Sequence, residues 1–208
     1  MTTTRSHWDG LYETTAVEQT GWYEPVPQPS LDLVQRCGLA LDAAIVDVGG
    51  GASTLADALL ALGYTRLTVA DISTIALQRL AARLGPERMQ HVRLVSADIT
   101  APECVAAMAP VDLWHDRALL HFLTAEADRR AYMRALRALV RPRGWVLLAA
   151  FAVGGATECS DLPVRNYDEA MLAAELGDEF TRIETLRTVY SQPSGGLRPY
   201  VYGLFRRR

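Results

Sequence analysis

The sequence predicts a doubly wound α/β fold, in which helices cover both faces of a mostly parallel, Rossmann-like sheet of seven strands. Two features of the 208-residue chain predict it. Short apolar runs alternate with amphipathic runs along most of the chain, which is the pattern of repeated βα units. The last part of the chain has two strand-like runs with no helix between them, so we expect an antiparallel hairpin at one end of the sheet.

The strands of the βα units are predicted where short runs of apolar, often β-branched residues stand between glycines or polar residues. The run at 144–152 has no charged residue and is typical of a strand that is buried on both faces. The predicted strands are 43–48, 66–72, 91–99, 111–116 and 144–152, followed by hairpin strands at about 179–190 and 199–206.

Helices are predicted between these strands, and several have recognisable ends. Ser53 or Thr54 is predicted to cap the first of them, and Gly63 is its expected end. The proline-rich segment Pro25–Pro29 excludes a regular helix there. The remaining helices are expected at 73–85, about 102–108, 124–140 and 167–176.

Length, composition and charge favour one globular domain over residues 1–208 and argue against nucleic acid as its main ligand. Half of the residues are apolar, enough for a substantial core, and the net charge of −3 offers no basic surface to a polyanion. All 21 basic residues are arginine. Because lysine is absent, Schiff-base chemistry, a pyridoxal-phosphate site and a P-loop are excluded.

The cysteine and histidine residues indicate neither a disulfide framework nor a metal site. Cys37, Cys104 and Cys159 are odd in number and far apart, without a CxxC pair, which favours a reducing compartment. The four histidines have no ligand-like spacing with one another or with the cysteines. Neither an apolar targeting stretch nor a run of 18 apolar residues occurs, so we expect a cytoplasmic protein that does not enter a membrane.

Three consecutive glycines follow the first predicted strand. Gly49, Gly50 and Gly51 let the backbone approach a ligand closely, and the helix that follows offers free N–H groups to it. A dinucleotide fingerprint would need glycine where Thr54 stands, and Asp47 would repel a diphosphate. The loop therefore favours a cationic or zwitterionic ligand, and an NAD-dependent dehydrogenase is a disfavoured alternative.

Carboxylates stand at the ends of three successive predicted strands, the edge at which such a sheet binds its ligands. After Asp47 come Asp71, placed to accept both hydroxyls of a ribose, and Asp98, placed to accept the exocyclic amine of an adenine. Each carboxylate alone is also consistent with a helix cap or a turn. The three together favour ligand binding.

The segments DVGGGAS, VADIS and SADI resemble the S-adenosylmethionine site of class I methyltransferases. Asp47, Gly49 and Gly51 match the family's acidic-x-Gly-x-Gly loop, and Ser53 stands at the usual third glycine. The resemblance covers nearly the whole chain, because the seven-strand order and the hairpin ending also match. It implies S-adenosylmethionine as cofactor. The implied cofactor-binding residues are Asp47, Gly49, Gly50, Gly51, Asp71, Ile72, Asp98, Ile99, His115, Trp8, Tyr12 and Trp22.

Further segments, HWDGLY with GWYEPVP, WHDRALLHFLT and CSDLPVRNY, resemble a bacterial branch of small methyltransferases. This branch is akin to the thiopurine and tellurite-resistance enzymes and, more distantly, to small protein-lysine methyltransferases. The resemblance implies that residues 1–30 form a lid over the cofactor through Trp8, Tyr12, Trp22 and Tyr23. Packing of the first helix onto the sheet by the same side chains stays open as a second interpretation.

The methyl acceptor is expected over the fourth strand, near WHDRALLHF, because this edge of the sheet binds ligands. Asp116 or His115 is predicted to accept a proton or to orient the acceptor. His121 is predicted either to act as a base or to be a buried, hydrogen-bonded histidine. Arg117 is predicted to hold a substrate carboxylate or to pair with a neighbouring acidic residue.

The irregular stretch 153–168, after the fifth strand, is expected to cover this site. Its Cys159, Ser160 and Arg165 are candidate substrate contacts, with an ordinary surface loop as the alternative. Phe151 and Tyr23 complete the predicted substrate-binding residues.

The predicted function is methyl transfer to a small-molecule acceptor, with a thiol or another soft nucleophile favoured. A thiol with a pKa of about 8.5 is partly ionised at neutral pH, whereas a lysine amine at about 10.4 must first be deprotonated. The sequence shows no dense cluster of carboxylates or tyrosines devoted to that task. A protein-lysine methyltransferase and a non-catalytic S-adenosylmethionine-binding module remain alternatives.

Overall fold

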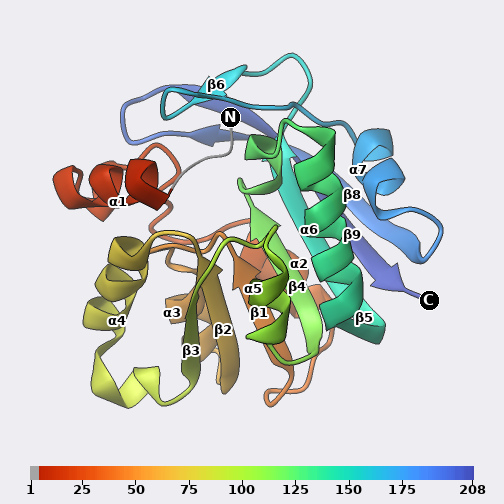
Figure 1. Cartoon of the computed structure of the whole chain (residues 1–208), viewed down its shortest axis with the longest axis horizontal. Coiled ribbons are helices and arrows are strands. Elements are labelled where there is room, and N and C mark those ends of the chain that lie inside the picture. Colours follow the sequence, from red (N-terminus) through yellow and green to blue (C-terminus); the bar gives the residue numbers. More distant parts are fainter. Residues whose placement is uncertain (1–4) are drawn as a thin grey trace.

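The computed structural model describes residues 5–208 and contains a sheet of seven strands in the order β3-β2-β1-β4-β5-β9-β8 (Figure 1). Strands β1 to β5 pair in parallel, and β9 is antiparallel to both β5 and β8. The predicted fold, a mostly parallel sheet with an antiparallel hairpin, is therefore confirmed. The strand bounds are β1 Ala44–Val48, β2 Arg66–Asp71, β3 Val92–Ser96, β4 Val111–Arg117, β5 Val140–Phe151, β8 Phe180–Ser191 and β9 Leu197–Arg207.

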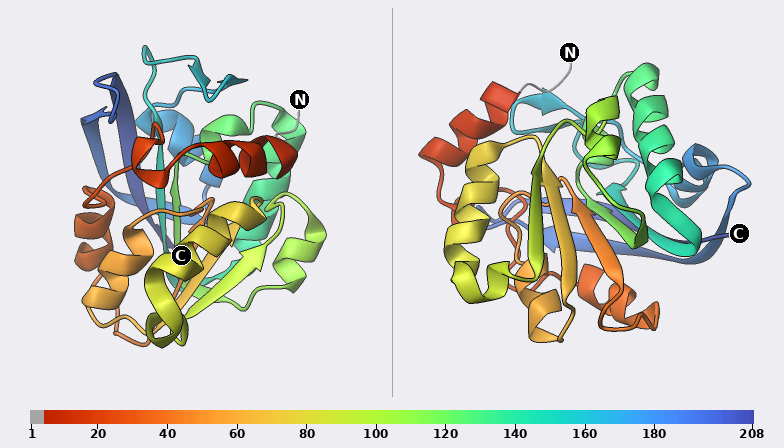
Figure 2. Two further views of the ribbon diagram at one scale, coloured as in Figure 1. Left: turned by 90° about the vertical axis from the view of Figure 1, so that its left-hand side faces the viewer. Right: turned by 60° about the horizontal axis from the view of Figure 1, so that its bottom comes forward.

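Helices cover both faces of the sheet (Figure 2). The buried leucines of α2, α3 and α4 pack with Ile45 and Leu113 in a core on one face. The buried residues of α5, α6 and α7 pack with Val46 and Trp114 in a core on the other face. The helix bounds are α1 Arg5–Thr14, α2 Ser30–Arg36, α3 Leu55–Ala61, α4 Thr74–Met89, α5 Pro102–Ala106, α6 Glu126–Leu139 and α7 Glu169–Leu176, with short 3₁₀ turns η1 Val17–Gln19 and η2 Leu120–Phe122.

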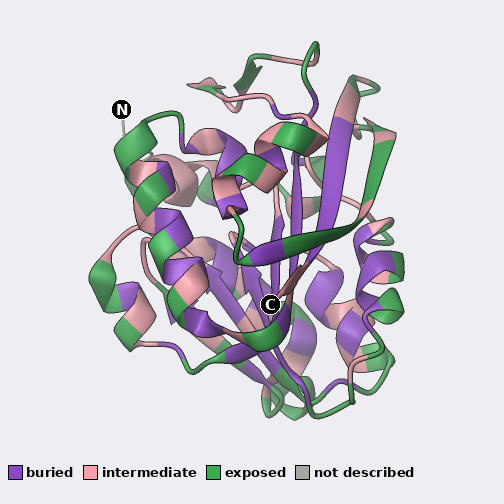
Figure 3. Ribbon diagram, turned by 90° about the vertical axis from the view of Figure 1, so that its right-hand side faces the viewer, coloured by how far each residue is buried: buried purple, intermediate pink, exposed green. Residues whose placement is uncertain are grey.

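Neighbouring residues of β1 enter different cores, because side chains alternate across a strand. Val46 and Val48 pack with α5 to α7, whereas Ile45 packs with α2 to α4, and each is at most 1% exposed. Burial on both faces explains why this strand is apolar without a polar alternation. Figure 3 shows the same burial along the middle strands of the sheet.

The parallel register brings the polar ends of neighbouring strands to one edge of the sheet. Asp47 of β1 stands beside Val69 of β2 and His115 of β4, and Asp71 is the last residue of β2. Helix α1 lies across this edge (Figures 1 and 2). The predicted lid 1–30 includes residues 1–4, which lie outside the described residues.

The strand predicted at 144–152 begins earlier, at Val140, and two other elements differ in length from their predictions for local reasons. The strand predicted at 91–99 ends at Ser96, because Asp98 Oδ1 accepts the N–H of Thr100 and makes a turn there. Gly85 interrupts the helix where predicted, with a φ of +74°, but α4 resumes for a last turn that ends at Met89.

Other elements were not predicted. Helix α2 begins at Ser30, immediately after the proline-rich segment, so the prolines exclude helix only up to that residue. Within the stretch 153–168, β6 (Glu158–Cys159) and β7 (Leu162–Pro163) form a small hairpin. Among the described residues, no helix combines the length and the apolar composition needed to cross a membrane.

The core between α6 and the sheet predicts a clear contrast between two leucine substitutions. Leu136 is fully buried, so Leu136→Ala is expected to lower the free energy of unfolding by about 2–5 kcal/mol. Leu41 is 55% exposed, and Leu41→Ala is expected to change it by less than about 1 kcal/mol. Urea denaturation measures both values, and similar losses in the two variants would contradict this account of the core.

Candidate functional site

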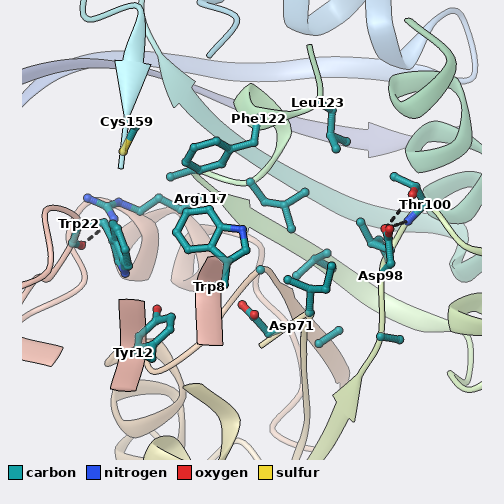
Figure 4. Close-up of a pocket in the computed structure, with 18 of the residues that line it drawn as sticks. Trp8, Tyr12, Trp22, Asp71, Asp98, Thr100, Arg117, Phe122, Leu123 and Cys159 are labelled. Atoms are coloured by element: carbon teal, nitrogen blue, oxygen red, sulfur yellow. Dashed lines mark hydrogen bonds between the residues drawn. The ribbon is translucent and has the colours of Figure 1, made fainter. Parts of the chain in front are cut away.

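Two neighbouring cavities lie at the carboxyl ends of the central strands, and Gly49, Trp22 and Arg117 line both. The larger one (Figure 4) encloses about 980 Å³ of empty space, a volume that includes its opening to solvent. Predicted residues that line it are Trp8, Tyr12, Trp22, Gly49, Asp71, Ile72, Asp98, Ile99, Arg117, Phe151 and Cys159. Predicted residues that line the smaller one are Trp22, Tyr23, Asp47, Gly49, Gly50, His115 and Arg117.

The glycine loop after β1 brings bare backbone to the larger cavity. Gly49 and Gly51 have φ values of +67° and +50°, which side-chain-bearing residues rarely adopt. A Cβ on Gly49 would lie 2.5 Å from Leu119 Cδ1, and one on Gly51 would lie 2.7 Å from the Tyr12 hydroxyl. Glycine is therefore required at both positions for the loop to hold its shape beneath α1.

Asp71 and Asp98 hold their carboxylates at the ends of β2 and β3, and both line the larger cavity. Asp71 Oδ1 accepts the N–H of Ser73 at 2.7 Å, and Asp98 Oδ1 accepts both the N–H and the hydroxyl of Thr100 at 2.8 and 2.7 Å. Burial raises the pKa of Asp71 to about 6. These turns fix two acceptors for ligand hydroxyl or amine groups on one wall.

A buried hydrogen-bond chain lies beneath the glycine loop. Asp47 Oδ1 is 2.7 Å from His115 Nδ1, and His115 Nε2 is 2.9 Å from the Ser30 hydroxyl. Asp47 Oδ2 also accepts the hydroxyl of Ser53 at 3.1 Å. Asp47 and His115 therefore tie the loop and α2 to the sheet, and they border the smaller cavity and not the larger one.

Arg117 fastens a segment that we call the strap, residues 20–24, to the sheet. Its Nη1 donates to the carbonyl of Trp22 at 3.0 Å, and its Nη2 is 3.1 Å from the Glu24 carboxylate. Its Nε donates to the hydroxyl of Tyr202 at 3.2 Å, and the guanidinium also lies about 5 Å from the ring centres of Tyr190 and Tyr200. The predicted pairing with an acidic residue is thus present, and its partner is the distant Glu24.

Aromatic residues from α1, the strap and η2 line the larger cavity while they pack against one another. Trp8 contacts both Trp22 and Phe122, and Tyr12 contacts Trp22. Helix α1 is held by Asp9 Oδ1, which accepts the Ser73 hydroxyl at 2.7 Å. These aromatic side chains therefore both cover the larger cavity, as a lid would, and pack α1 against the rest of the protein.

Asp116 was predicted as a catalytic residue, and its position contradicts that role. It points to the opposite face of β4 from His115 and Arg117, where it lines neither cavity. Its carboxylate accepts the N–H of Leu119 at 2.9 Å and the hydroxyl of Tyr132 at 2.6 Å. Burial raises its pKa to about 6. Asp116 thus stabilises the turn that leads into η2.

His121 and Arg165 also line neither cavity. His121 Nδ1 accepts the N–H of Phe151 at 3.4 Å, and burial lowers the pKa of His121 to about 3. It is therefore the buried, neutral histidine of the second interpretation and not a base. Arg165 lies over the ring of Tyr167 and 4.0 Å from the Glu175 carboxylate, which turns it away from the site.

The larger cavity has an aromatic end that sequence reasoning predicted only in part. Phe151 and Cys159 were predicted there, and Figure 4 shows Cys159 beside Arg117. Phe122 and Tyr200 also line it and were missed. Phe122 stands within the DRALLHF segment, so its position beside His121 was the available signal, whereas Tyr200 comes from the distant hairpin. Ser160 lines neither cavity.

The fold and this site define a class of protein. The strand order, the glycine loop after β1 and the carboxylates after β2 and β3 occur together at one edge of the sheet. Residues 46–146 match a family described as a methyltransferase domain. This match places a methyltransferase domain within the chain, and the chain shares its fold with a solved S-adenosylmethionine-dependent methyltransferase from Anabaena variabilis, with a TM-score of 0.76 at 16% identity, covering 98% of this chain and 95% of that chain. The bare backbone at Gly49 and the carboxylates of Asp71 and Asp98, which line the larger cavity, fit S-adenosylmethionine, whereas Gly51 lines neither cavity.

Individual similar proteins differ in what they methylate. Human EEF1A lysine methyltransferase 2 is 22% identical over 198 residues, covering 89% of this chain and 77% of that protein. A structure from work on the conversion of a disulfide bond into a thioacetal group during echinomycin biosynthesis has a TM-score of 0.78 at 20% identity, covering 98% and 93% of the chains. A structure of Burkholderia thailandensis 1,6-didemethyltoxoflavin-N1-methyltransferase contains 1,6-didemethyltoxoflavin and S-adenosylhomocysteine. Its TM-score is 0.71 at 22% sequence identity, and the match covers 98% of this chain and 86% of that chain. The thiopurine-type branch stays a prediction.

The buried carboxylate of Asp71 predicts a pH effect on stability. Its pKa is raised from 3.8 to about 6, so the folded protein holds this proton more tightly than the unfolded chain. The free energy of unfolding is therefore expected to fall as the pH rises from about 4 to about 6, by on the order of 1–3 kcal/mol.

Asp71→Asn cannot titrate, but its side chain keeps an oxygen that accepts the Ser73 N–H. Its free energy of unfolding is therefore expected to fall less than that of wild type as the pH rises from about 4 to about 6. Asp32→Asn, at an exposed position of α2, is the control. Urea denaturation at pH 4, 5, 6 and 7 gives the comparison, and parallel curves for Asp71→Asn and wild type would rule out the shift.

Proposed function

We propose that this methyltransferase acts on a small molecule that carries a thiol or another soft nucleophile. The observation that carries the proposal is the composition of the larger cavity. Among the described residues that line it, the acidic ones are Asp71 and Asp98, and both stand at the ends of β2 and β3. The end near Phe151, Tyr200 and Cys159 is aromatic and contains no carboxylate.

The cofactor takes the end of the cavity that holds the carboxylates. In this proposal Asp71 accepts the ribose hydroxyls, and Asp98 and Ile99 flank the adenine. The methionine part of the cofactor lies against the backbone at Gly49. When bound, S-adenosylmethionine supplies a methyl group on a positively charged sulfur, already activated for displacement by a nucleophile. The task of the chain is then to align the acceptor with that methyl group and to exclude water.

The acceptor end offers no base to a nucleophile that must lose a proton. Burial lowers the pKa of His121 to about 3 and raises the pKa of the Tyr200 hydroxyl above its usual value, so neither group accepts or releases a proton readily near neutral pH. Arg117 also lines this cavity, and its partner Glu24 lines the smaller one, so no described carboxylate of the larger cavity stands at this end to hold a protonated amine. A thiol is partly ionised without help, so it suits this environment better than an amine.

The covering of the cavity favours a small acceptor. Helix α1 and the strap cover one side, and residue Cys159 of the β6–β7 hairpin reaches the other. An acceptor enclosed on these sides and walled by Phe122 and Phe151 has to be compact and largely apolar.

A protein-lysine methyltransferase is the second candidate. The similarity to human EEF1A lysine methyltransferase 2 over 198 residues favours it. It requires a lysine side chain to pass between α1 and the β6–β7 hairpin and to be deprotonated within the site. A cofactor-binding module without catalysis is the third, and absence of transfer to any fraction would support it. The predicted cytoplasmic location belongs to the proposal as well.

Binding of the cofactor is expected to depend on Asp71. Asp71→Ala removes a charged acceptor of ribose hydroxyls, so it is expected to weaken S-adenosylmethionine binding roughly 10- to 100-fold. Isothermal titration calorimetry measures this loss, and Asp32→Ala, an exposed change on α2, is expected to bind like wild type. Unchanged binding in Asp71→Ala would refute the assignment of this residue.

Methyl transfer is tested with S-adenosylmethionine that carries a radiolabelled methyl group, incubated with the protein in a cell extract from its source. Volatile, small-molecule and protein fractions are counted separately, with Asp71→Ala as the matched inactive control. Label in the volatile or small-molecule fraction is expected. Label confined to protein bands would overturn the proposal in favour of the lysine alternative.

A further inference from the structure

We propose that the aromatic cluster of Trp8, Trp22 and Phe122 recognises the positive charge of the methyl donor. In this proposal the cluster adds to the affinity for S-adenosylmethionine and adds nothing comparable for S-adenosylhomocysteine, the uncharged product. The inference rests on the placement of donor and acceptor proposed above, and it does not depend on which acceptor is methylated.

The three rings come from separate elements and stand nearly at right angles. The centre of the Trp8 ring is 5.7 Å from that of Trp22 and 5.1 Å from that of Phe122, at interplanar angles of 76° and 77°. Tyr12 extends the cluster, 6.0 Å from Trp22 at 68°. All four residues line the larger cavity. The rings contact one another edge to face, so a cation meets them only where a ring face borders the cavity, and it is attracted there when it lies within about 6 Å of the ring centre.

The cluster stands where the transferable methyl group has to be. Figure 4 shows Trp8 between Asp98 and Thr100 on one side and Trp22 and Arg117 on the other. If adenosine lies on the first side and the acceptor on the second, the sulfur that carries the transferable methyl group lies between them. Trp8 is therefore the described side chain best placed to meet its charge.

The charge of the sulfur has few other partners in this cavity. Of the two acidic residues that line it, Asp98 is held by Thr100 and Asp71 by the Ser73 N–H, at the strand ends. Asp47 lies beneath the glycine loop against His115. A cation transferred from water into such surroundings loses its hydration, and ring faces can compensate for part of that loss.

Transfer itself removes the charge that the rings attract. An electron pair of the acceptor would form the new bond to the methyl carbon as the bond from that carbon to sulfur breaks. The pair of the broken bond would stay on sulfur, leaving a neutral thioether, and a neutral acceptor would take up the positive charge or lose a proton. The attraction to the cluster is lost with the charge, so the spent cofactor keeps only the contacts of its adenosine and amino acid parts. A cluster that only packs the lid would instead contribute equally to both forms.

The test is isothermal titration calorimetry of S-adenosylmethionine and S-adenosylhomocysteine with wild type, Trp8→Leu, Trp8→Phe and Trp145→Leu. Leucine fills space without a ring face, so Trp8→Leu is expected to raise the Kd for S-adenosylmethionine about 3- to 30-fold more than the Kd for S-adenosylhomocysteine. Trp8→Phe keeps a ring face, so its ratio of the two Kd values is expected to stay close to the wild-type ratio. Trp145 lies outside both cavities, over Arg206, and its variant is expected to leave the ratio of the two Kd values unchanged.

Equal weakening of both ligands in Trp8→Leu would overturn the proposal and leave packing as the role of the ring. If Trp8→Leu binds neither ligand because the lid no longer forms, Phe122→Leu gives the same comparison from η2, with the Trp8–Trp22 contact and the Asp9–Ser73 hydrogen bond of α1 retained. Wild-type protein that binds neither ligand would refute the cofactor itself, a failure distinct from equal weakening.

Discussion

The enclosure of the site depends on the guanidinium of Arg117. From the end of β4, this group reaches the carbonyl of Trp22 and the carboxylate of Glu24 in the strap and the hydroxyl of Tyr202 in the hairpin. One side chain thus joins three parts of the chain that are far apart in the sequence. A buried charge is stable only while its partners are present, so the strap, the strand and the hairpin hold their positions together.

The end of the larger cavity that holds Asp71 and Asp98 could be predicted from sequence because its information is local. A buried strand followed by Gly49 to Gly51 specifies a tight βα turn, and Asp71 and Asp98 each close a turn with residues two positions away. Parallel pairing then aligns these strand ends without any further contact. The fold was predictable for the same reason, since the period of the apolar residues fixes each element before they pack.

The end of the cavity near Arg117 could not be predicted in this way, because its contacts connect distant residues. Nothing near Arg117 in the sequence indicates Glu24 or Tyr202 as its partners. The prediction for Asp116 had a different fault: residues 115, 116 and 117 were treated as one polar group, although alternation along β4 places Asp116 on the opposite face. A strand with three consecutive polar residues has to send one of them into the other core.

Helix α1 and the strap, which together cover the cavity, are each anchored to the rest of the protein, and this has consequences for turnover. Asp9 holds α1 to the start of α4, and Arg117 holds the strap to β4 and the hairpin. Ligand exchange requires at least one of these anchors to detach, whereas displacement at an activated methyl group needs only alignment. We therefore expect the detachment of α1 or the strap, and not bond making, to set the rate of catalysis. The two anchors would then also govern how fast a bound ligand exchanges with solvent.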